Sequence, residues 1–99
     1  RYSGASRPVQ RIAVCGGSGT EFLREAVSQG ADAMVTADVK YHTFQEFESS
    51  LLVVDAGHYE TEHIVLPALA ATVKNIFKRN KHTGKVLITA NNTNPVHIF

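Results

Sequence analysis

Apolar and polar positions along this chain alternate in blocks that predict strands followed by helices. Short apolar runs lie between clusters of Gly, Pro, Asp or Asn, which is typical of strands. Between these runs, apolar residues recur three and four positions apart, which is typical of amphipathic helices. We expect strands over residues 10–15, 33–37, 51–54 and 85–90, and helices over residues 20–29, 43–50 and about 58–79.

The order of these elements is βαβαβαβ, which indicates an α/β fold. Strands joined through helices pair in parallel with right-handed crossovers. The run Leu51–Val54 is apolar at consecutive rather than alternating positions, which favours burial on both faces of a sheet. We therefore expect a three-layer α/β lobe with a mostly parallel sheet over residues 10–99. Residues 1–9 are expected to form a linker or a ragged start.

Two Ser/Thr-x-x-Glu spacings predict where the first two helices begin. Ser18 and Glu21 have the spacing of a capping box, and so do Thr43 and Glu46. Pro67 cannot donate a backbone N–H, so it either kinks the third helix or marks the first turn of its straight part.

Composition narrows the classes of function. Lys and Arg number 10 against 9 Asp and Glu, a formal charge of +1, which argues against binding to nucleic acid or to acidic membranes. The single cysteine, Cys15, excludes an internal disulfide and fits a reducing compartment, so we expect a cytoplasmic protein. No apolar run approaches the roughly 18 residues that a membrane span needs. A start at Arg1 rather than Met suggests a fragment or a processed product.

Three of the predicted strands end in turns that are rich in ligand-capable side chains. The first is the Gly16–Gly19 turn, the second contains Asp38, Lys40 and His42, and the third begins at Asp55. Because the carboxyl ends of parallel strands meet at one edge of a sheet, we expect these turns to lie close together. A binding site at that edge is the prediction.

The third turn leads to a histidine and a glutamate four residues apart. In a helix, His58 and Glu62 would share one face with their Cβ atoms about 5–6 Å apart. Imidazole and carboxylate at this distance suit two ligands of one metal ion. The same spacing is also common on ordinary solvated helices. Asp55 could orient a ligating histidine or, more commonly, cap the following turn.

The other candidates each have a structural alternative. Backbone N–H groups of Gly16, Gly17, Ser18 and Gly19 could hold a phosphate at a helix N-terminus, or the glycines could simply allow a tight turn and close packing. Lys40 could stabilise an anion, and His42 could transfer a proton or contact a substrate. For both, the alternative is a solvated surface residue.

Four segments in this order resemble a known family. They are RIAVCGGSG, TADVKYH, VVDAGHYETE followed by LPAL, and NPV. Together they are similar to the C-terminal half of type 2 GTP cyclohydrolase I homologues, also called Nif-three-like proteins, from Arg11 to Val96. That resemblance implies two similar α/β halves that face a dinuclear metal site, assembled into toroidal hexamers.

The resemblance also implies roles for particular residues. His58 and Glu62 would be metal ligands, and the family's other ligands, two adjacent histidines and an aspartate, would come from an N-terminal half that this sequence does not contain. The ions would be two divalent metals such as Zn, Mn, Fe or Co.

Three functions are compatible with these residues. The first is a metal-dependent hydrolase acting on a nucleotide or phosphoester, with His42 and Lys40 as catalytic residues and the Gly16–Gly19 turn on a phosphate. The second is a non-enzymatic metal-binding or regulatory interaction protein that uses the same ligands. The third is a nucleotide-binding module that uses only the Gly16–Gly19 turn.

Overall fold

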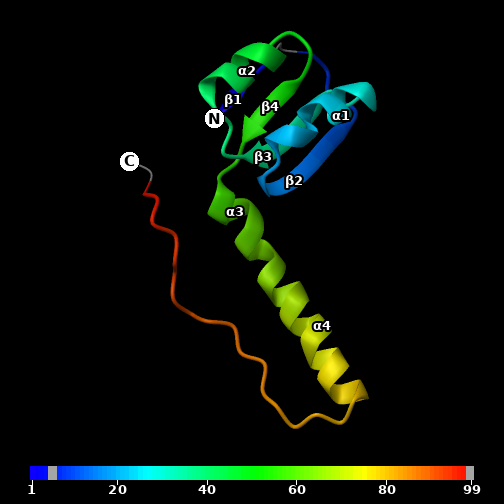
Figure 1. The fold of residues 1–99 in the computed structure, drawn as a ribbon, viewed down its shortest axis with the longest axis vertical. Helices are drawn as coiled ribbons and strands as arrows, with labels where there is room; N and C mark the ends of the chain where they lie inside the picture. The colour runs from blue at the N-terminus through cyan, green and yellow to red at the C-terminus, as the bar shows by residue number, and fades with distance from the viewer. Residues whose placement is uncertain (5–6, 98–99) are drawn as a thin grey trace. The chain divides into compact units, whose positions relative to one another are not determined.

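The computed structural model describes residues 1–4 and 7–97. The chain forms two compact units, Arg1–Glu62 and His63–Phe99, and Figure 1 shows their elements. In chain order these are β1 (Tyr2–Ser3), β2 (Ile12–Ser18), the 3₁₀ turn η1 (Thr20–Phe22), α1 (Leu23–Ser28), β3 (Ala33–Ala37), α2 (Tyr41–Phe47), β4 (Leu52–Asp55), α3 (His58–Glu62), the 3₁₀ turn η2 (His63–Val65) and α4 (Leu66–Arg79).

The first unit is built on a four-stranded sheet with the order β1-β4-β3-β2. Strand β3 pairs in parallel with β2 on one side and with β4 on the other, as βαβ connections require. Strand β1 pairs with β4 in the antiparallel direction, Tyr2 opposite Val54. The expected α/β class with a mostly parallel sheet is therefore confirmed, and the segment expected to be a linker contains a short strand.

Strand β2 runs further than its apolar residues predict. It continues through the glycines to Ser18, and its register with β3 is irregular between Val14 and Ser18. Extra residues in one strand of a pair leave backbone groups unpaired and bend the strand. Gly16 and Gly17 lie within this irregular stretch of β2.

The core lies between one face of this sheet and helices α1 and α2 (Figure 1). Its buried members are Leu23, Ala26, Ala31, Met34, Val39, Phe47, Leu51 and Val53. On the opposite face, β4 residues Leu52 and Val54 are only half-buried, so within this unit helices cover a single face. The consecutive apolar run in β4 correctly predicts a strand, but burial on both faces is not reached inside this unit.

Both predicted capping boxes are wrong. Ser18 is the last residue of β2 and pairs with Ala37, so Gly19 rather than Ser18 precedes η1, and no side chain caps it. Helix α2 begins two residues before Thr43, with Lys40 at its N-cap in an extended conformation and no side-chain cap. The Ser/Thr-x-x-Glu spacing is short and common, and the strand ends decide where these helices start.

The second unit contains the clearest departure from the predicted elements. Among the described residues after Arg79, none belongs to a helix or strand, so the strand predicted over 85–90 is absent. A strand needs a neighbour, and the four strands of the sheet, in the order β1-β4-β3-β2, pair only with one another. The Leu87 side chain is 85% exposed, so it is not buried against other residues of this unit.

The long helix predicted from the central turn is divided by η2 into α3 and α4. Pro67 lies in the first turn of α4, one of the two places predicted for it. No helix in the described part of the chain is long and apolar enough to cross a bilayer.

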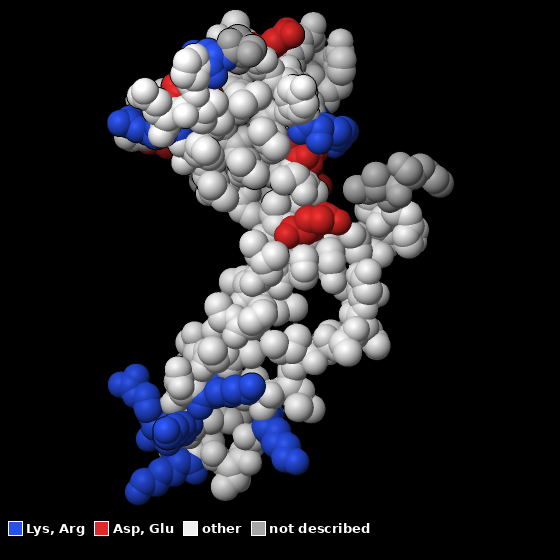
Figure 2. Space-filling view, turned by 180° about the vertical axis from the view of Figure 1, so that it is seen from behind, with Lys and Arg blue, Asp and Glu red and all other residues white. Residues whose placement is uncertain are grey.

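Charge is distributed unevenly between the two units. The segment from His63 onwards contains no Asp or Glu, whereas its cations gather around the C-terminal end of α4 and the segment after it (Figure 2). They are Lys74, Lys78, Arg79, Lys81 and Lys85. The near-zero net charge of the whole chain therefore does not describe either unit.

One buried carboxylate joins the turns that follow β3 and β4. Asp55, at the end of β4, accepts hydrogen bonds from the backbone N–H groups of Val39 at 3.2 Å and Gly57 at 3.2 Å. It also pairs with the guanidinium of Arg1. Burial raises the pKa of Asp55, but the hydrogen bonds from Arg1, Gly57 and Val39 outweigh burial and lower its pKa below the ordinary value.

We expect Asp55→Ala to lower the free energy of unfolding by about 2–4 kcal/mol, because each buried donor left without a partner costs about 1–3 kcal/mol. Urea unfolding measures this value. Asp32→Ala is the matched control, since Asp32 also accepts two backbone N–H groups, from Gln10 and Arg11, but in an exposed place where water can replace it. An equal loss in the two variants would contradict the structural role assigned to Asp55.

Candidate metal centre

His58 and Glu62 lie on the same face of α3, as their spacing predicts. His58 is the first residue of this helix and Glu62 the last, and Gly57 before it turns the chain with φ of +91°. His58 Nε2 and Glu62 Oε1 are 3.2 Å apart, and the two side chains are 48% and 55% exposed. Two unlike donor atoms therefore face each other at a place that solvent reaches.

The other ring nitrogen of His58 is bound to Asp38. His58 Nδ1 lies 2.6 Å from Asp38 Oδ2, the shorter of the two contacts that the imidazole makes. Asp38 directly follows β3, and β3 is the neighbour of β4 in the sheet. The converging-turn argument includes Asp38 but assigns it no role, because nothing in local spacing links it to a histidine twenty residues further on.

Gly17 forms the wall behind this pair. Its N–H donates to Thr61 Oγ1 at 2.9 Å, and this bond ties the bent end of β2 to α3. A Cβ atom at Gly17 would lie 2.2 Å from Glu62 Oε1 and 3.2 Å from His58 Nε2. The φ of +64° at Gly17 also favours glycine. Thr61 is a second residue of the site that sequence reasoning missed.

The remaining residues of the Gly16–Gly19 turn are explained by packing. A Cβ atom at Gly16 would meet the carbonyl oxygen of Thr61 at 3.1 Å, and one at Gly19 would collide with Cys15 and Thr36. Ser18 belongs to β2. Because the N–H of Gly17 is already bound to Thr61, it is not available to a phosphate in this arrangement.

Lys40 and His42 are not brought to the His58–Glu62 pair. Both are exposed, and in the described part of the chain neither side chain makes a hydrogen bond or ion pair with His58 or Glu62. The ring of His42 instead contacts that of Tyr41 edge-on, with centroids 5.3 Å apart. The edge of the sheet thus gathers Gly17, Asp38, His58 and Glu62.

A metal ion fits the geometry of this pair. Ligand atoms about 2.0–2.1 Å from a zinc ion are about 3.3 Å apart in a tetrahedral site, and about 3.0 Å apart at neighbouring octahedral positions. The 3.2 Å between His58 Nε2 and Glu62 Oε1 lies between these values. In residues 1–4 and 7–97, no group of three or more His, Cys, Asp and Glu side chains is arranged to hold a metal. The described chain therefore offers two ligands.

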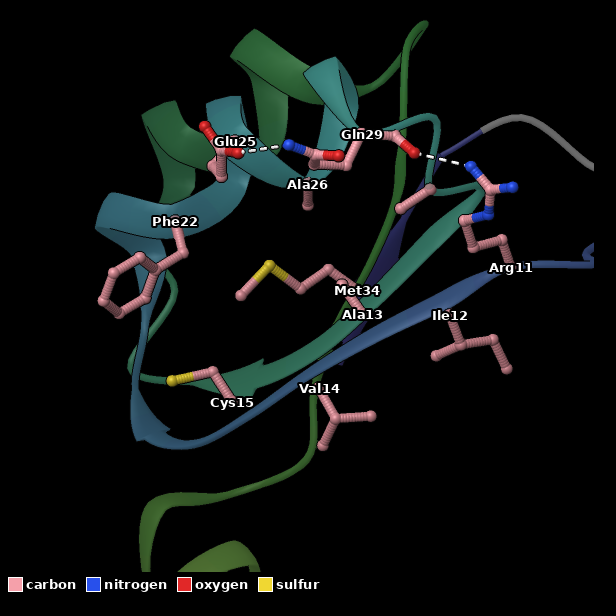
Figure 3. A pocket seen from close by; sticks show the side chains of 11 residues that line it. Arg11, Ile12, Ala13, Val14, Cys15, Phe22, Glu25, Ala26, Gln29 and Met34 are labelled. Carbon is pink, nitrogen blue, oxygen red and sulfur yellow. Dashed lines mark hydrogen bonds between the residues drawn. The ribbon is translucent and has the colours of Figure 1, made fainter.

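A separate hollow of about 470 Å³ lies beside β2 and α1 (Figure 3). Apolar side chains such as Val14, Phe22 and Met34 line most of it, and its polar groups, Arg11, Glu25 and Gln29, bond to one another at its rim. Polar groups that converge on a reacting atom are the mark of a catalytic pocket. The polar groups of this hollow are bonded to one another, so the His58–Glu62 pair is the stronger candidate site.

Comparison with known proteins shows which family the chain belongs to. The family model Duf34/NIF3 (NGG1p interacting factor 3) matches residues 1–95. The chain belongs to the Duf34/NIF3 family. It is 38% identical over 92 residues to a protein called GTP cyclohydrolase 1 type 2 homolog from Streptococcus pneumoniae, covering 92% of this chain and 34% of that one. A protein of the same name from Nostoc sp. is 41% identical over 75 residues, 75% of this chain and 27% of its own.

Solved structures of Duf34/NIF3 relatives share the fold. Staphylococcus aureus hypothetical protein SA1388 matches all of this chain with a TM-score of 0.88 and 32% identity, over 33% of its own length. A Bacillus cereus protein related to NIF3 matches with a TM-score of 0.90 and 25% identity, over 28% of its length. This chain therefore spans about a third of the length of the relatives it matches.

The contacts of His58 predict a dependence of stability on pH. The hydrogen bond to Asp38 is the main factor that raises the pKa of His58, partial desolvation lowers it, and the charge of Glu62 raises it, with a net pKa above the ordinary 6.5. Because this pKa is raised in the folded state, protonated His58 stabilises the metal-free protein. This stabilisation is fully present below about pH 6.5 and is lost as pH rises through the folded-state pKa. Urea unfolding between pH 6 and 9 should show this decline. His58→Gln should flatten it, and an unchanged profile in His58→Gln would contradict the assignment.

Gly17→Ala should disturb the pair as well as the backbone. An L side chain at positive φ costs about 1–2 kcal/mol, and the added Cβ would push the Glu62 carboxylate away. Gly30→Ala is the matched control, since Gly30 has φ of +73° but its Cβ would meet only the guanidinium end of Arg11, at 3.1 Å. We expect both variants to lose similar stability, and only Gly17→Ala to lose metal affinity, by about tenfold or more, in a zinc titration. Equal affinities in the two variants would contradict this prediction.

Proposed function

We propose that this chain supplies two ligands, His58 and Glu62, to a divalent metal centre. The other ligands would come from the rest of a full-length protein. By full-length protein we mean one that contains this chain and is about as long as its relatives. The observation that carries the proposal is the approach of His58 Nε2 to Glu62 Oε1 at 3.2 Å, in a place where Gly17 leaves room and solvent has access. Imidazole and carboxylate together suit Zn²⁺, Mn²⁺, Fe²⁺ and Co²⁺.

Two protein ligands make an incomplete site. Catalytic zinc sites commonly have three protein ligands and structural sites four. A chain with two ligands binds metal weakly alone, and strongly once further ligands arrive from elsewhere in the protein or its assembly. The proposal extends to a pair of ions and to a homo-oligomer, the hexamer that the family resemblance implies.

The chemistry we propose for this centre is hydrolysis of a nucleotide or phosphoester. A bound divalent ion polarises a phosphoryl oxygen and lowers the pKa of bound water. On the protein side, Glu62 and His58 hold the ion, and Thr61 holds their helix against Gly17. Lys40 and His42 would act on substrate from the neighbouring turn, with Lys40 facing an anionic group and His42 transferring a proton.

A non-enzymatic metal-binding or regulatory protein is the second candidate. It is favoured by the placement of Lys40 and His42, since both are exposed and make no bond to the ligand pair. The two candidates differ in turnover. Metal-dependent hydrolysis across a panel of nucleotides and phosphoesters supports the enzyme, and a blank across the panel with full metal supports the second candidate.

The metal content of the full-length protein tests the proposal shared by both candidates. We expect His58→Ala to lose most of the bound metal, measured by elemental analysis after purification, because one of two ligands from this chain is removed. His82→Ala is the matched control, since it removes an exposed histidine from the second unit. Metal at the wild-type level in His58→Ala would refute the proposal, and loss in His82→Ala as well would point to general misfolding.

A further inference from the structure

Asp38 is held in a backbone conformation that its residue type rarely adopts. Its φ of +56° lies in the left-handed region, and among the described residues only Lys81 is a second non-glycine of this kind. A short polar side chain makes that region accessible to Asp, yet glycine would occupy it without strain. The next residue, Val39, is fixed by its N–H bond to Asp55 and by burial in the core. The position of Val39 therefore fixes the backbone conformation of the turn. Asp38 must adopt a positive φ in this turn although glycine would do so with less strain.

Stability does not explain why an aspartate stands at this position. The Asp38 and His58 side chains are 54% and 48% exposed. Ion pairs this exposed contribute little to folding, because water screens them and both side chains lose freedom. A glycine at residue 38 would remove the backbone strain at the expense of only this weak pair. The side chain is thus better explained by what it does to His58.

The two contacts of the imidazole differ in length, and the shorter one is to Asp38. Asp38 Oδ2 is 2.6 Å from Nδ1, whereas Glu62 Oε1 is 3.2 Å from Nε2. A neutral imidazole has one N–H, and the shorter contact to a carboxylate holds it. With the proton of a neutral ring on Nδ1, the lone pair of Nε2 faces Glu62, which is the arrangement that a metal ligand needs.

We propose that Asp38 is a positioning residue that fixes the tautomer and the ring plane of His58, so that Nε2 is presented beside Glu62 as a metal ligand. Asp38 is not itself a ligand of that ion, because its carboxylate is bound at the opposite edge of the imidazole ring. Carboxylates that accept the second N–H of a ligating histidine act in this way in other metal sites. This inference rests on the proposed function.

Two substitutions separate positioning from folding. Asp38→Asn keeps the size of the side chain and its tolerance of positive φ but removes the charge that holds the Nδ1 proton. Asp38→Gly removes the whole side chain and the backbone strain, so its thermal midpoint should be equal to or above that of the wild type. Both variants should bind zinc about 10–100-fold more weakly in the full-length protein, measured by calorimetry. Asp32→Asn, which removes a carboxylate far along the chain from His58, should bind as the wild type does.

A spectroscopic readout tests the orientation directly, without metal. The full-length protein is labelled with ¹⁵N-histidine, stripped with a chelator, and observed by NMR at a pH where His58 is neutral. His58, assigned by its loss in His58→Gln, should be protonated at Nδ1 in the wild type. In Asp38→Asn and Asp38→Gly the proton should move partly or wholly to Nε2.

The outcomes distinguish this inference from the proposed function. Wild-type zinc affinity together with an unchanged tautomer in Asp38→Asn would overturn the positioning role and leave the metal centre in place. A wild-type protein that takes up no zinc would overturn the metal centre, and the positioning role with it. If Asp38→Gly lowers both the thermal midpoint and the zinc affinity, the weaker binding is explained by lost stability. Asp38 would then be a structural residue, and the inference would be overturned.

Discussion

The site depends on Asp55, a carboxylate that accepts backbone N–H groups from two different turns. Val39 and Gly57 lie far apart in the sequence, and each is next to a residue of the site, Asp38 and His58. Because β3 and β4 are parallel neighbours, their following turns leave the sheet at the same edge. Without this common acceptor, the N–H groups of Val39 and Gly57 would lose their partner, and the bonds that join the two turns would be gone.

The other residues of the candidate site have conformations and contacts that reduce the stability of the fold. Asp38 has positive φ, its pair with His58 is half exposed, and Gly17 leaves a gap that a larger residue would fill. None of these features strengthens the core, which lies between α1, α2 and the sheet. Strain and exposed charge gathered at one edge are typical of sites that bind or react. The contrast with the well-packed core of the same unit is what makes this edge the candidate site.

How far the sequence predicts the fold depends on whether an element's partner is close in the chain. Strand β3 has its predicted bounds, because its apolar run lies between its own two neighbours. Residues 85–90 have equal strand character but pair with no other strand, and local pattern carries no information about which segments will pair. Capping boxes fail for a similar reason, since Ser18 is still paired in β2 where a cap was expected.

The same limit applies to the site. His58 and Glu62 are found from sequence because four residues of helix bring them together, and the class of fold follows from alternation alone. Asp38 and Thr61 are not found, because each contact joins separate elements: Asp38 to a histidine 20 residues away, and Thr61 to a glycine 44 residues away. Such contacts exist only once the sheet has assembled. The family resemblance names ligands but not the residues that orient them.

Electrostatics favours an order of events at this edge. Asp38 and Glu62 place two carboxylates around one imidazole, and Gly17, whose N–H is already bound to Thr61, stands beside them. The Glu62 carboxylate lies close to Gly17, since a Cβ atom at Gly17 would be 2.2 Å from Glu62 Oε1. A phosphate bound at the glycine turn without a cation would therefore be repelled by the negative charge of Glu62. A divalent ion held by His58 and Glu62 would neutralise the charge of these two carboxylates. A phosphate ligand of this turn would therefore need the proposed metal ion. This requirement separates the metal-centre proposal from a nucleotide-binding module that uses the glycines alone.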